Sequence, residues 1–421
     1  MAATVATDSY AGKWISMGKI EEFRRGWSLI LAAATGVGLG ITGLTFYTLG
    51  IFIGPLTQEF GWSRTSLASA TILTTLTTLI LGPVVGRLAD RFGGRKVGLV
   101  SLVGLAAGLG GLSLIGAELW SFYLAFGIAM VLGAGTLPIV WTRAVNAGFD
   151  KARGMALGLT LTGTGVVAIL APPYTQWLIA DYGWRMAYLG QAALVLAIGL
   201  PIVWLLFHEV GGAKHVTAAT TLVRPGLTAA AARRSRQFWM LGVGFLFASF
   251  AVSALIVHLV SILSGGGMER ASAVWAASLL GFAIIAGRLG IGVLVDRFYA
   301  PAVAFGILAI AGAACFLLML AGANLSLALA AVVLIGLAAG AEVDLVAYLA
   351  SRYFGLRAYG EIYGWQLGFF ALGAGLGPMG VGRLYDATGS YTVGLIACAV
   401  GFGVGATLIG LLGRYPERFE E

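Results

Sequence analysis

The sequence predicts an all-α membrane protein in which about twelve transmembrane helices form two six-helix bundles. The first observation behind this prediction is composition: 59% of the residues are hydrophobic, only 10% are charged, and the mean hydropathy is +0.92. Such a chain has too little polar surface to cover a soluble globule, so lipid must form part of its solvent. The second observation is a series of long apolar runs, and the third is an internal repeat.

Apolar runs long enough to cross a hydrocarbon core of roughly 30 Å recur along the chain. The expected spans are 27–53, 65–85, 97–116, 119–143, 154–178, 184–207, 238–263, 271–294, 301–322, 325–349, 361–384 and 391–413. They divide the chain into an N-terminal cytoplasmic tail (1–26), an N-terminal six-helix bundle (27–207), a cytoplasmic linker (208–237), a C-terminal six-helix bundle (238–413) and a C-terminal cytoplasmic tail (414–421). The first tail contains no apolar stretch, so we do not expect a cleaved signal there.

The two halves of the chain are related by a parallel internal repeat. Displacing the chain on itself by about 206 residues superposes residues of the same type at many positions. The matched pairs include Gly86 with Gly292, Asp90 with Asp296, Arg91 with Arg297 and Pro172 with Pro378. Matched glycines are weak evidence in a chain with 64 of them, but Asp, Arg and Pro at the same offset indicate a duplicated six-helix unit. Parallel repeats of this kind are typical of alternating-access transporters, which bind cargo near the midplane between the halves.

Positive charge is distributed unevenly between the two sides of the expected membrane. With both termini cytoplasmic, most Lys and Arg residues fall in cytoplasmic loops, as the positive-inside rule favours. The same asymmetry explains the net charge of +8 without nucleic-acid binding. The sequence thus predicts a multi-pass protein of the cell inner membrane. Cys315 and Cys398 fall inside expected spans, so we expect them to be buried, with no disulfide or metal role.

A charged segment between the second and third expected spans carries a family resemblance. The segment Gly86-Arg-Leu-Ala-Asp90-Arg91-Phe-Gly93-Gly-Arg95-Lys96 resembles the signature loop of the major facilitator superfamily, and Gly292-Val-Leu-Val-Asp296-Arg297 resembles its degenerate second copy. Within that superfamily, Gly61-Trp-Ser-Arg64 and Gly377-Pro378 resemble segments of the monocarboxylate porter and oxalate/formate antiporter branch. The resemblance covers essentially the whole chain and implies the major facilitator fold.

The two signature segments supply candidate gating residues, and the resemblance implies that they latch helix ends together in one transport state. The candidates are Gly86, Asp90, Arg91, Arg95, Asp296 and Arg297. A carboxylate at the end of the second span can accept hydrogen bonds from helix N-termini, and we expect Asp90 also to pair with Arg91 or Arg95. The alternative is that these cations only anchor the topology.

Arg288 gives the most direct indication of a cargo. It precedes Asp296 by eight residues, so about 12 Å of helix places it close to the membrane midplane. A guanidinium there is costly without an anionic partner, and its planar fork matches a carboxylate. The resemblance implies the same role, because the arginine of span 8 binds the substrate carboxylate in monocarboxylate porters. A structural ion pair or a side chain that snorkels to the interface is the alternative.

Three titratable side chains are candidates for proton coupling: Asp344, Glu342 and His258. Asp344 lies about as deep as Arg288 by the same helical arithmetic. We expect it to pair with Arg288 when the site is empty and to take a proton when cargo displaces it. Glu342 points elsewhere, since it is about 200° from Asp344 around the helix. His258 is a candidate because histidine is the side chain that commonly carries protons at physiological pH, but it lies near a helix end, where a hydrogen-bonding role is the competing interpretation.

The chain departs from the family pattern at other charged positions. Animal monocarboxylate carriers have an Asp one turn before the span-8 arginine, where this sequence has Ile284, and their span-1 lysine aligns near Thr48. The span-11 lysine of oxalate carriers is also missing from the segment around Gln366. A single fixed cation favours a cargo with one carboxylate. Tyr47, Tyr348 and Gln366 are candidate contacts that orient it, although aromatic residues at span ends commonly anchor helices at the interface.

The predicted function is secondary active transport of a small organic anion, foremost a monocarboxylate, by proton symport or by antiport. An exporter of amphipathic compounds or drugs and a membrane sensor that reuses the fold are the alternatives. No enzymatic activity, metal or cofactor is expected, because the chain has three His and no nucleotide-binding or metal-ligand motif. The expected partners are the organic acid, protons and the lipid bilayer, without nucleic acid, and the expected functional unit is a monomer.

Overall fold

The computed structural model describes residues 18–63, 66–67, 69–209 and 225–416, and all regular elements in these ranges are helical. The N-terminal half comprises α2 (Lys19–Gly38), η1 (Ile41–Thr45), α3 (Phe46–Phe60), α5 (Thr71–Phe92), α6 (Gly94–Leu112), α7 (Leu119–Gly133), η2 (Ala134–Thr136), α8 (Pro138–Gly148), α9 (Arg153–Leu194), η3 (Val195–Gly199) and α10 (Leu200–Leu206). The C-terminal half comprises α11 (Ala229–Arg234), α12 (Arg236–Gly265), α13 (Arg270–Val295), α14 (Ala300–Ala321), α15 (Leu325–Phe354), α16 (Tyr359–Thr388) and α17 (Thr392–Gly410). Parts of the expected tails and linker, and Arg64, lie outside the described residues.

Most of these helices are long and apolar enough to cross a bilayer. Nine described segments meet that condition by themselves, and α2 meets it together with η1 and α3 as a pair bent by 44°. The segment Arg153–Leu206 has 54 residues, far more than the roughly 20 that one crossing needs. It bends back at Gly183, whose φ of 81° favours glycine. With α13 and both arms of this segment, the described residues are consistent with the predicted twelve crossings.

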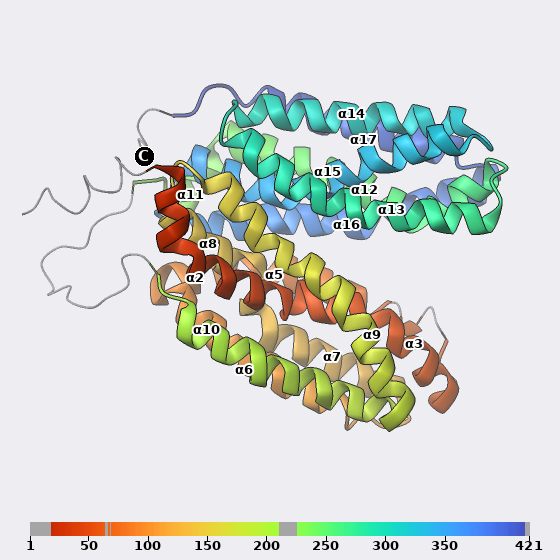
Figure 1. Ribbon diagram of the computed structural model, residues 1–421, viewed down its shortest axis with the longest axis horizontal. Coiled ribbons are helices and arrows are strands. Elements are labelled where there is room, and N and C mark those ends of the chain that lie inside the picture. Colours follow the sequence, from red (N-terminus) through yellow and green to blue (C-terminus); the bar gives the residue numbers. More distant parts are fainter. Residues whose placement is uncertain (1–17, 64–65, 68, 210–224, 417–421) are drawn as a thin grey trace, which may run out of the picture.

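The helices form two bundles that come together at one end of the molecule. In Figure 1, α12, α13, α14, α16 and α17 run side by side in the upper part, and α2, α5, α6, α7 and α9 lie below them at an angle. The bundles converge where α10 ends and α11 begins, and we call this end the linker side. They diverge toward the opposite end (Figure 1).

Glycines let the two bundles approach to backbone contact near the linker side. A Cβ added at Gly86 on α5 would lie 1.9 Å from the carbonyl oxygen of Gly360 on α16. A Cβ added at Gly154 on α9 would lie 2.5 Å from the carbonyl oxygen of Gly292 on α13. These four glycines are two repeat-related pairs, so the duplication builds the same close contact twice, with no room for a larger residue.

Side-chain hydrogen bonds hold α12 against α16 within the C-terminal bundle. Pro378 has no N–H, so the carbonyl of Ala374 lacks its helical partner, and Ser253 Oγ donates to that oxygen at 2.8 Å. Ser249 Oγ donates in the same way to the carbonyl of Phe370 at 2.8 Å. Because such bonds have no competing water in lipid, they fasten the two helices together.

The structure corrects the predicted helix boundaries where charged residues occur. The signature segment expected to be a loop is helical as far as Phe92, and Gly93, with a φ of 87°, separates α5 from α6. Hydropathy places the end of this span at residue 85 because Arg87, Asp90 and Arg91 follow it. These long or hydrogen-bonded side chains reach water, headgroups or protein partners from the last turns of the helix, so they do not end it.

Gly86→Ala is expected to weaken the closed linker side, because the added methyl would meet the backbone at Gly360 and not a movable side chain. Overpacking of this kind costs about 1–3 kcal/mol. The alkylation rate of a cysteine introduced into this interface should therefore rise. Gly290→Ala is the matched control, since a Cβ there has no neighbour within 4 Å. Equal alkylation rates in the two variants would contradict the proposed close packing.

Candidate functional site

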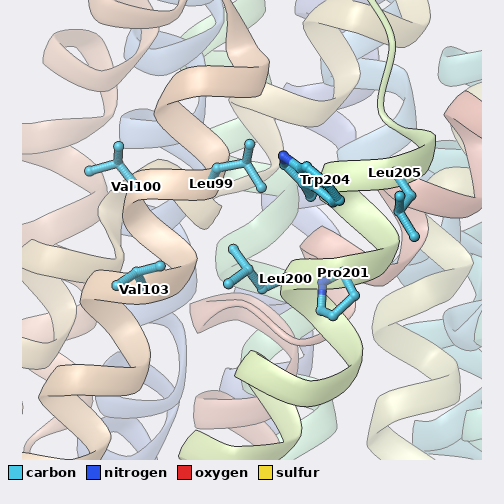
Figure 2. Close-up of a pocket in the computed structure, with 7 residues that line it drawn as sticks. All are labelled: Leu99, Val100, Val103, Leu200, Pro201, Trp204 and Leu205. Atoms are coloured by element: carbon cyan, nitrogen blue, oxygen red, sulfur yellow. The ribbon is translucent and has the colours of Figure 1, made fainter.

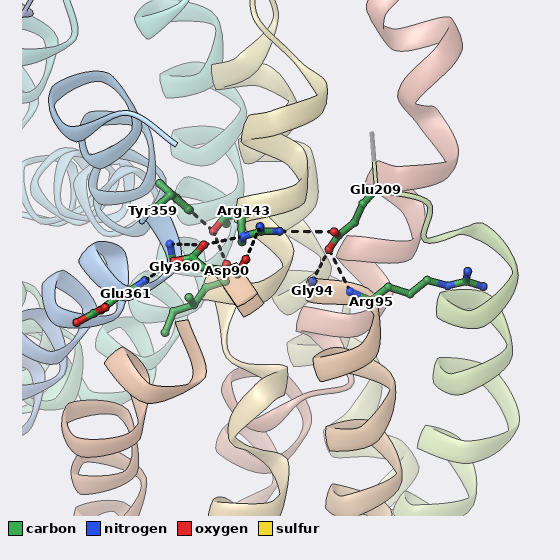
Figure 3. A network of polar contacts seen from close by, with 10 residues as sticks. Asp90, Gly94, Arg95, Arg143, Glu209, Tyr359, Gly360 and Glu361 are labelled. Atoms are coloured by element: carbon green, nitrogen blue, oxygen red, sulfur yellow. Dashed lines mark hydrogen bonds and ion pairs between the residues drawn. The ribbon is translucent and has the colours of Figure 1, made fainter. Parts of the chain in front are cut away.

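The Asp90 carboxylate joins the two bundles on the linker side. It accepts hydrogen bonds from the N–H groups of Gly360 at 3.2 Å and Glu361 at 3.1 Å, in the first turn of α16. Arg143 on α8 donates from Nε to the same carboxylate at 2.8 Å. A helix N-terminus carries partial positive charge, so an anion there is stabilising. We call Asp90, Arg143 and the N-terminus of α16 the α16 latch (Figure 3).

Two further carboxylates extend the α16 latch. Glu209, just after α10, lies 3.5 Å from Arg143 and accepts a hydrogen bond from the N–H of Arg95 at 3.1 Å (Figure 3). Arg143 therefore bridges two anions. Glu361 accepts two hydrogen bonds from Arg87, at 3.1 and 2.9 Å. The Arg87 side chain is 64% exposed, so solvent weakens this second pair relative to the enclosed contacts of Arg143.

A second carboxylate repeats the arrangement with the bundles exchanged. Asp296 accepts hydrogen bonds from the N–H of Gly154 at 2.7 Å and of the following residue at 3.3 Å, at the start of α9. Lys19 lies 3.9 Å from this carboxylate, whereas Leu349 stands at the repeat position of Arg143. We call Asp296 and the N-terminus of α9 the α9 latch. It has the helix-end contacts of the α16 latch, but among the described residues no arginine pairs with its carboxylate.

The prediction that Asp90 pairs with Arg91 or Arg95 is wrong, because Arg143 takes that place. Arg91 is exposed, with its guanidinium 5.2 Å from the centre of a neighbouring aromatic ring. Arg95 donates to a backbone carbonyl of α10, and Arg297 is exposed at the end of α13. In the sequence, Arg143 is the last residue of an apolar run (119–143), so it was not among the predicted site residues. An arginine isolated at the end of such a run is the signal that could have identified it.

A second polar group lies deeper, between the bundles. Arg288 on α13 donates from Nη1 to the carbonyl oxygen of Leu161 on α9 at 2.6 Å. Asp344 on α15 is 3% exposed, and neither carboxylate oxygen has a hydrogen-bond partner among the described residues. The ion pair predicted between Arg288 and Asp344 is not among those formed by the described residues. The guanidinium turns to the α9 carbonyl instead, while remaining within electrostatic range of Asp344.

Tyr363 on α16 completes this group. Its side chain is fully buried, its hydroxyl has no hydrogen-bond partner within the described part of the chain, and Asp344 and Arg288 are among its electrostatic neighbours. A Cβ added at Gly158 on α9 would lie 3.6 Å from an Asp344 carboxylate oxygen, so the opposite bundle presents its smallest residue here. We call Arg288, Asp344 and Tyr363 the polar triad. Tyr363 was not predicted as a site residue, because it lies at the start of the expected span 361–384, where an interfacial tyrosine is common.

The polar triad belongs to one half of the repeat. Gly82, Pro138 and Leu157 stand at the corresponding positions of the N-terminal half. None of them carries a charge or a polar side chain, so the duplicated halves differ in chemistry at these three positions.

The other predicted substrate contacts differ in their availability. Tyr348 donates its hydroxyl to the carbonyl of Val295 at 3.0 Å, and Gln366 donates from Nε2 to the carbonyl of Phe238 at 3.1 Å. Both groups thus support helix packing in this conformation. Tyr47 on α3 is 39% exposed, which leaves its side chain open to a contact.

The remaining titratable candidates occupy different environments. Glu342 is 1% exposed, and its Oε1 has no hydrogen-bond partner among the residues described. His258 Nε2 lies 2.9 Å from the carbonyl oxygen of Pro378, and its Nδ1 lies 3.4 Å from the Tyr391 hydroxyl. His258 therefore makes the packing hydrogen bonds that sequence analysis gave as the competing interpretation.

Both cysteines, Cys315 and Cys398, are buried and unpaired. Within the described ranges, no group of three or more His, Cys, Asp or Glu side chains could hold a metal ion. The polar chemistry of the described interior is thus that of arginine, carboxyl, hydroxyl and amide groups.

Comparison with known proteins identifies the family, because the sequence profile of the Major Facilitator Superfamily matches residues 35–378. The chain belongs to this superfamily. It is 27% identical over 385 residues to Monocarboxylate transporter 11 of Mus musculus, covering 89% of this chain and 85% of that protein. It is 30% identical over 385 residues to an uncharacterized 38 kDa protein of Thermoproteus tenax, covering 89% and 92%. The structure of the superfamily transporter FucP in the outward conformation has a TM-score of 0.71 at 17% identity, covering 92% and 98%.

Membership in this superfamily fixes the class of protein. The chain is an integral, multi-pass membrane transporter with a small-molecule cargo, and it is not an enzyme. The bilayer is part of its environment, as the run of apolar helices requires. The fold prediction from composition, repeat and signature segments is confirmed at this level.

Asp90→Asn is expected to shift this transporter toward a state that is open on the linker side. The variant exchanges charge-assisted hydrogen bonds to α16 for neutral ones and leaves Arg143 with one anion. The free energy that stabilises the closed linker side should fall by about 2 kcal/mol. The distance between spin labels on the linker-side ends of α5 and α16 should increase. Asp296→Asn is the matched variant and should have a smaller effect, because no arginine of the described residues pairs with Asp296. Unchanged distances in Asp90→Asn would refute the latch.

Proposed function

We propose that this transporter carries a small organic anion with one carboxylate. The observation that supports this cargo is Arg288, which reaches α9 of the opposite bundle and forms no ion pair with a described residue. Its place on α13, eight residues before Asp296, corresponds to about 12 Å of helix from the linker-side end. An arginine at this depth is costly and calls for an anion. The similarity to proteins named monocarboxylate transporters points to the same class of cargo.

The polar triad supplies complementary contacts for such an anion. The planar guanidinium of Arg288 can bind a carboxylate with two parallel hydrogen bonds, and the Tyr363 hydroxyl can donate a third or accept from a hydroxyl of the cargo. Asp344 nearby offsets much of the positive charge. Arg288 is the only cation of the triad, so a second carboxylate on the cargo would have no counter-charge there, and the triad favours monocarboxylates over dicarboxylates.

Asp344 is our proposed coupling residue. Among the described residues, the guanidinium of Arg288 is the cation that acts electrostatically on Asp344. When a cargo carboxylate occupies Arg288, the positive charge is shared between two anions, and Asp344 becomes more stable with a proton. Cargo and proton would then bind and leave together. Glu342 is a weaker candidate because its direction on α15 differs from that of Asp344 by about 200°, and His258 is engaged in packing.

We propose that the transporter works by alternating access, with the two latches controlling the linker side. The two latches seal the linker side, and both carboxylates must leave their helix N-termini before this end can open. We propose that the linker side is cytoplasmic, with both termini on that side of the cell inner membrane, since Lys and Arg are concentrated there. We also propose that the monomer is the functional unit, because both bundles that meet at the triad belong to one chain.

Proteoliposomes that contain the wild-type chain are expected to take up labelled lactate or pyruvate faster than oxalate. Arg288→Lys keeps the charge but loses the bidentate geometry, so uptake should fall by about tenfold or more. Arg414→Gln, which removes an exposed cation near the end of the chain, is the control and should transport normally. Undiminished uptake by Arg288→Lys would refute the site, and uptake confined to amphipathic cations would favour the exporter.

Asp344→Asn should separate cargo binding from proton coupling. Exchange of labelled for unlabelled cargo at equal pH should persist, because Arg288 remains, whereas accumulation driven by a pH gradient should be lost. Glu342→Gln removes a second buried acid from the same helix and serves as the matched control, with gradient-driven accumulation retained. The proposal fails for Asp344 if Asp344→Asn keeps the wild-type pH dependence.

A further inference from the structure

A lipid-facing groove on the N-terminal bundle takes no part in the transport chemistry described above. It lies between α6 and α10 and has a volume of about 770 Å³. Its lining is apolar and includes Leu99, Val100, Val103, Leu200, Pro201 and Trp204 (Figure 2). These side chains leave much of their surface uncovered by protein: Val100 is 72% exposed and Trp204 is 58% exposed.

Two cations stand at the linker-side mouth of this groove. Lys96 lies three, four and seven residues before Leu99, Val100 and Val103, so it shares their face of α6. Arg95 donates from Nη2 to the carbonyl of Trp204, which places its guanidinium beside the groove, and Figure 3 shows it reaching toward the neighbouring helix.

Neither cation is neutralised by a carboxylate of the described residues. No ion pair between described residues includes Arg95 or Lys96. Arg95 Nε is buried and has no hydrogen-bond partner within the described part of the chain. The nearby carboxylate of Glu209 is occupied by backbone N–H groups and by Arg143. The mouth of the groove therefore has unused donors and uncompensated positive charge at the level of the headgroups.

The C-terminal half provides an internal comparison, because the repeat places a corresponding pair of helices, α14 and α17, there. Pro301 and Ala302 stand at the positions of the two cations, so the charge is absent. Gly410 stands at the position of Trp204, and a Cβ added to it would lie 3.0 Å from the ring of Phe305, which packs against it. The tryptophan that lines the groove and the two cations at its mouth thus occur together in one half and are replaced together in the other.

We propose that the α6–α10 groove binds an anionic phospholipid from the leaflet on the linker side. One acyl chain lies along Val100, Val103 and Trp204, and the phosphate accepts hydrogen bonds from Arg95 and Lys96. Apolar area holds the chain, and each nearby cation adds attraction for an anionic headgroup. This inference does not depend on the identity of the cargo.

The test measures lipid binding to the purified full-length chain. Native mass spectrometry of the chain in detergent, titrated with phosphatidylglycerol or with phosphatidylcholine of the same acyl composition, gives the two dissociation constants. Phosphatidylglycerol should bind more tightly, and Lys96→Gln should weaken its binding about fivefold, as expected for the loss of one interfacial cation. Val100→Phe fills the groove without disturbing the core, because Val100 is exposed, and should also weaken binding. Arg414→Gln removes one cation from the C-terminal half and should leave binding unchanged.

Quenching gives a second readout that locates the lipid. Phosphatidylglycerol with brominated acyl chains should quench part of the tryptophan emission, and Trp204→Phe should remove that part. Equal affinity for the two lipids, equal weakening by Lys96→Gln and Arg414→Gln, or no effect of Val100→Phe would each overturn the proposal. Quenching unchanged by Trp204→Phe would overturn it as well.

Discussion

Closure of this transporter on the linker side depends on carboxylates that are held against helix N-termini of the opposite bundle. Asp90 bonds to the start of α16 and Asp296 to the start of α9. Each contact is local to one helix turn, where the partial charge of the helix end is greatest. The glycine pairs beneath the latches bring the backbones close enough for a short aspartate side chain to reach across.

The two latches differ in strength although the duplication gave them the same plan. Arg143 adds a buried charge to one latch and bridges it to Glu209, whereas Lys19 approaches the other only at 3.9 Å. Removing one member of an enclosed charge network leaves its partner uncompensated, which is costly in a medium with little water. The α16 latch is therefore the more robust of the two, and its carboxylates couple the ends of α5, α6, α8 and α16 into one cluster.

Much of the fold and part of the site could be predicted from the sequence. Hydropathy predicted the spans, and the internal repeat predicted that Asp90 and Asp296 occupy equivalent positions. Both features can be read directly from the order of residues in the chain. The helical rise gave the depth of Arg288. The partner of Asp90 and the contact from Arg288 to Leu161 could not be predicted, because side-chain direction depends on how the bundles pack. Tyr363 was not predicted as a site residue for the same reason, since its burial beside Arg288 depends on how the helices pack.

The polar triad lies in the C-terminal half alone, so the two halves of the chain have different roles toward a bound anion. Where the C-terminal half has an arginine, an acid and a phenol, the N-terminal half has three uncharged residues, Gly82, Pro138 and Leu157. Bonds from Ser249 and Ser253 keep α12 and α16 together, so the C-terminal half is braced behind its site. An anion bound there would stay with the C-terminal half while the N-terminal half moves relative to it. The symmetry of the duplication is then kept in the two latches and lost at the site of the polar triad.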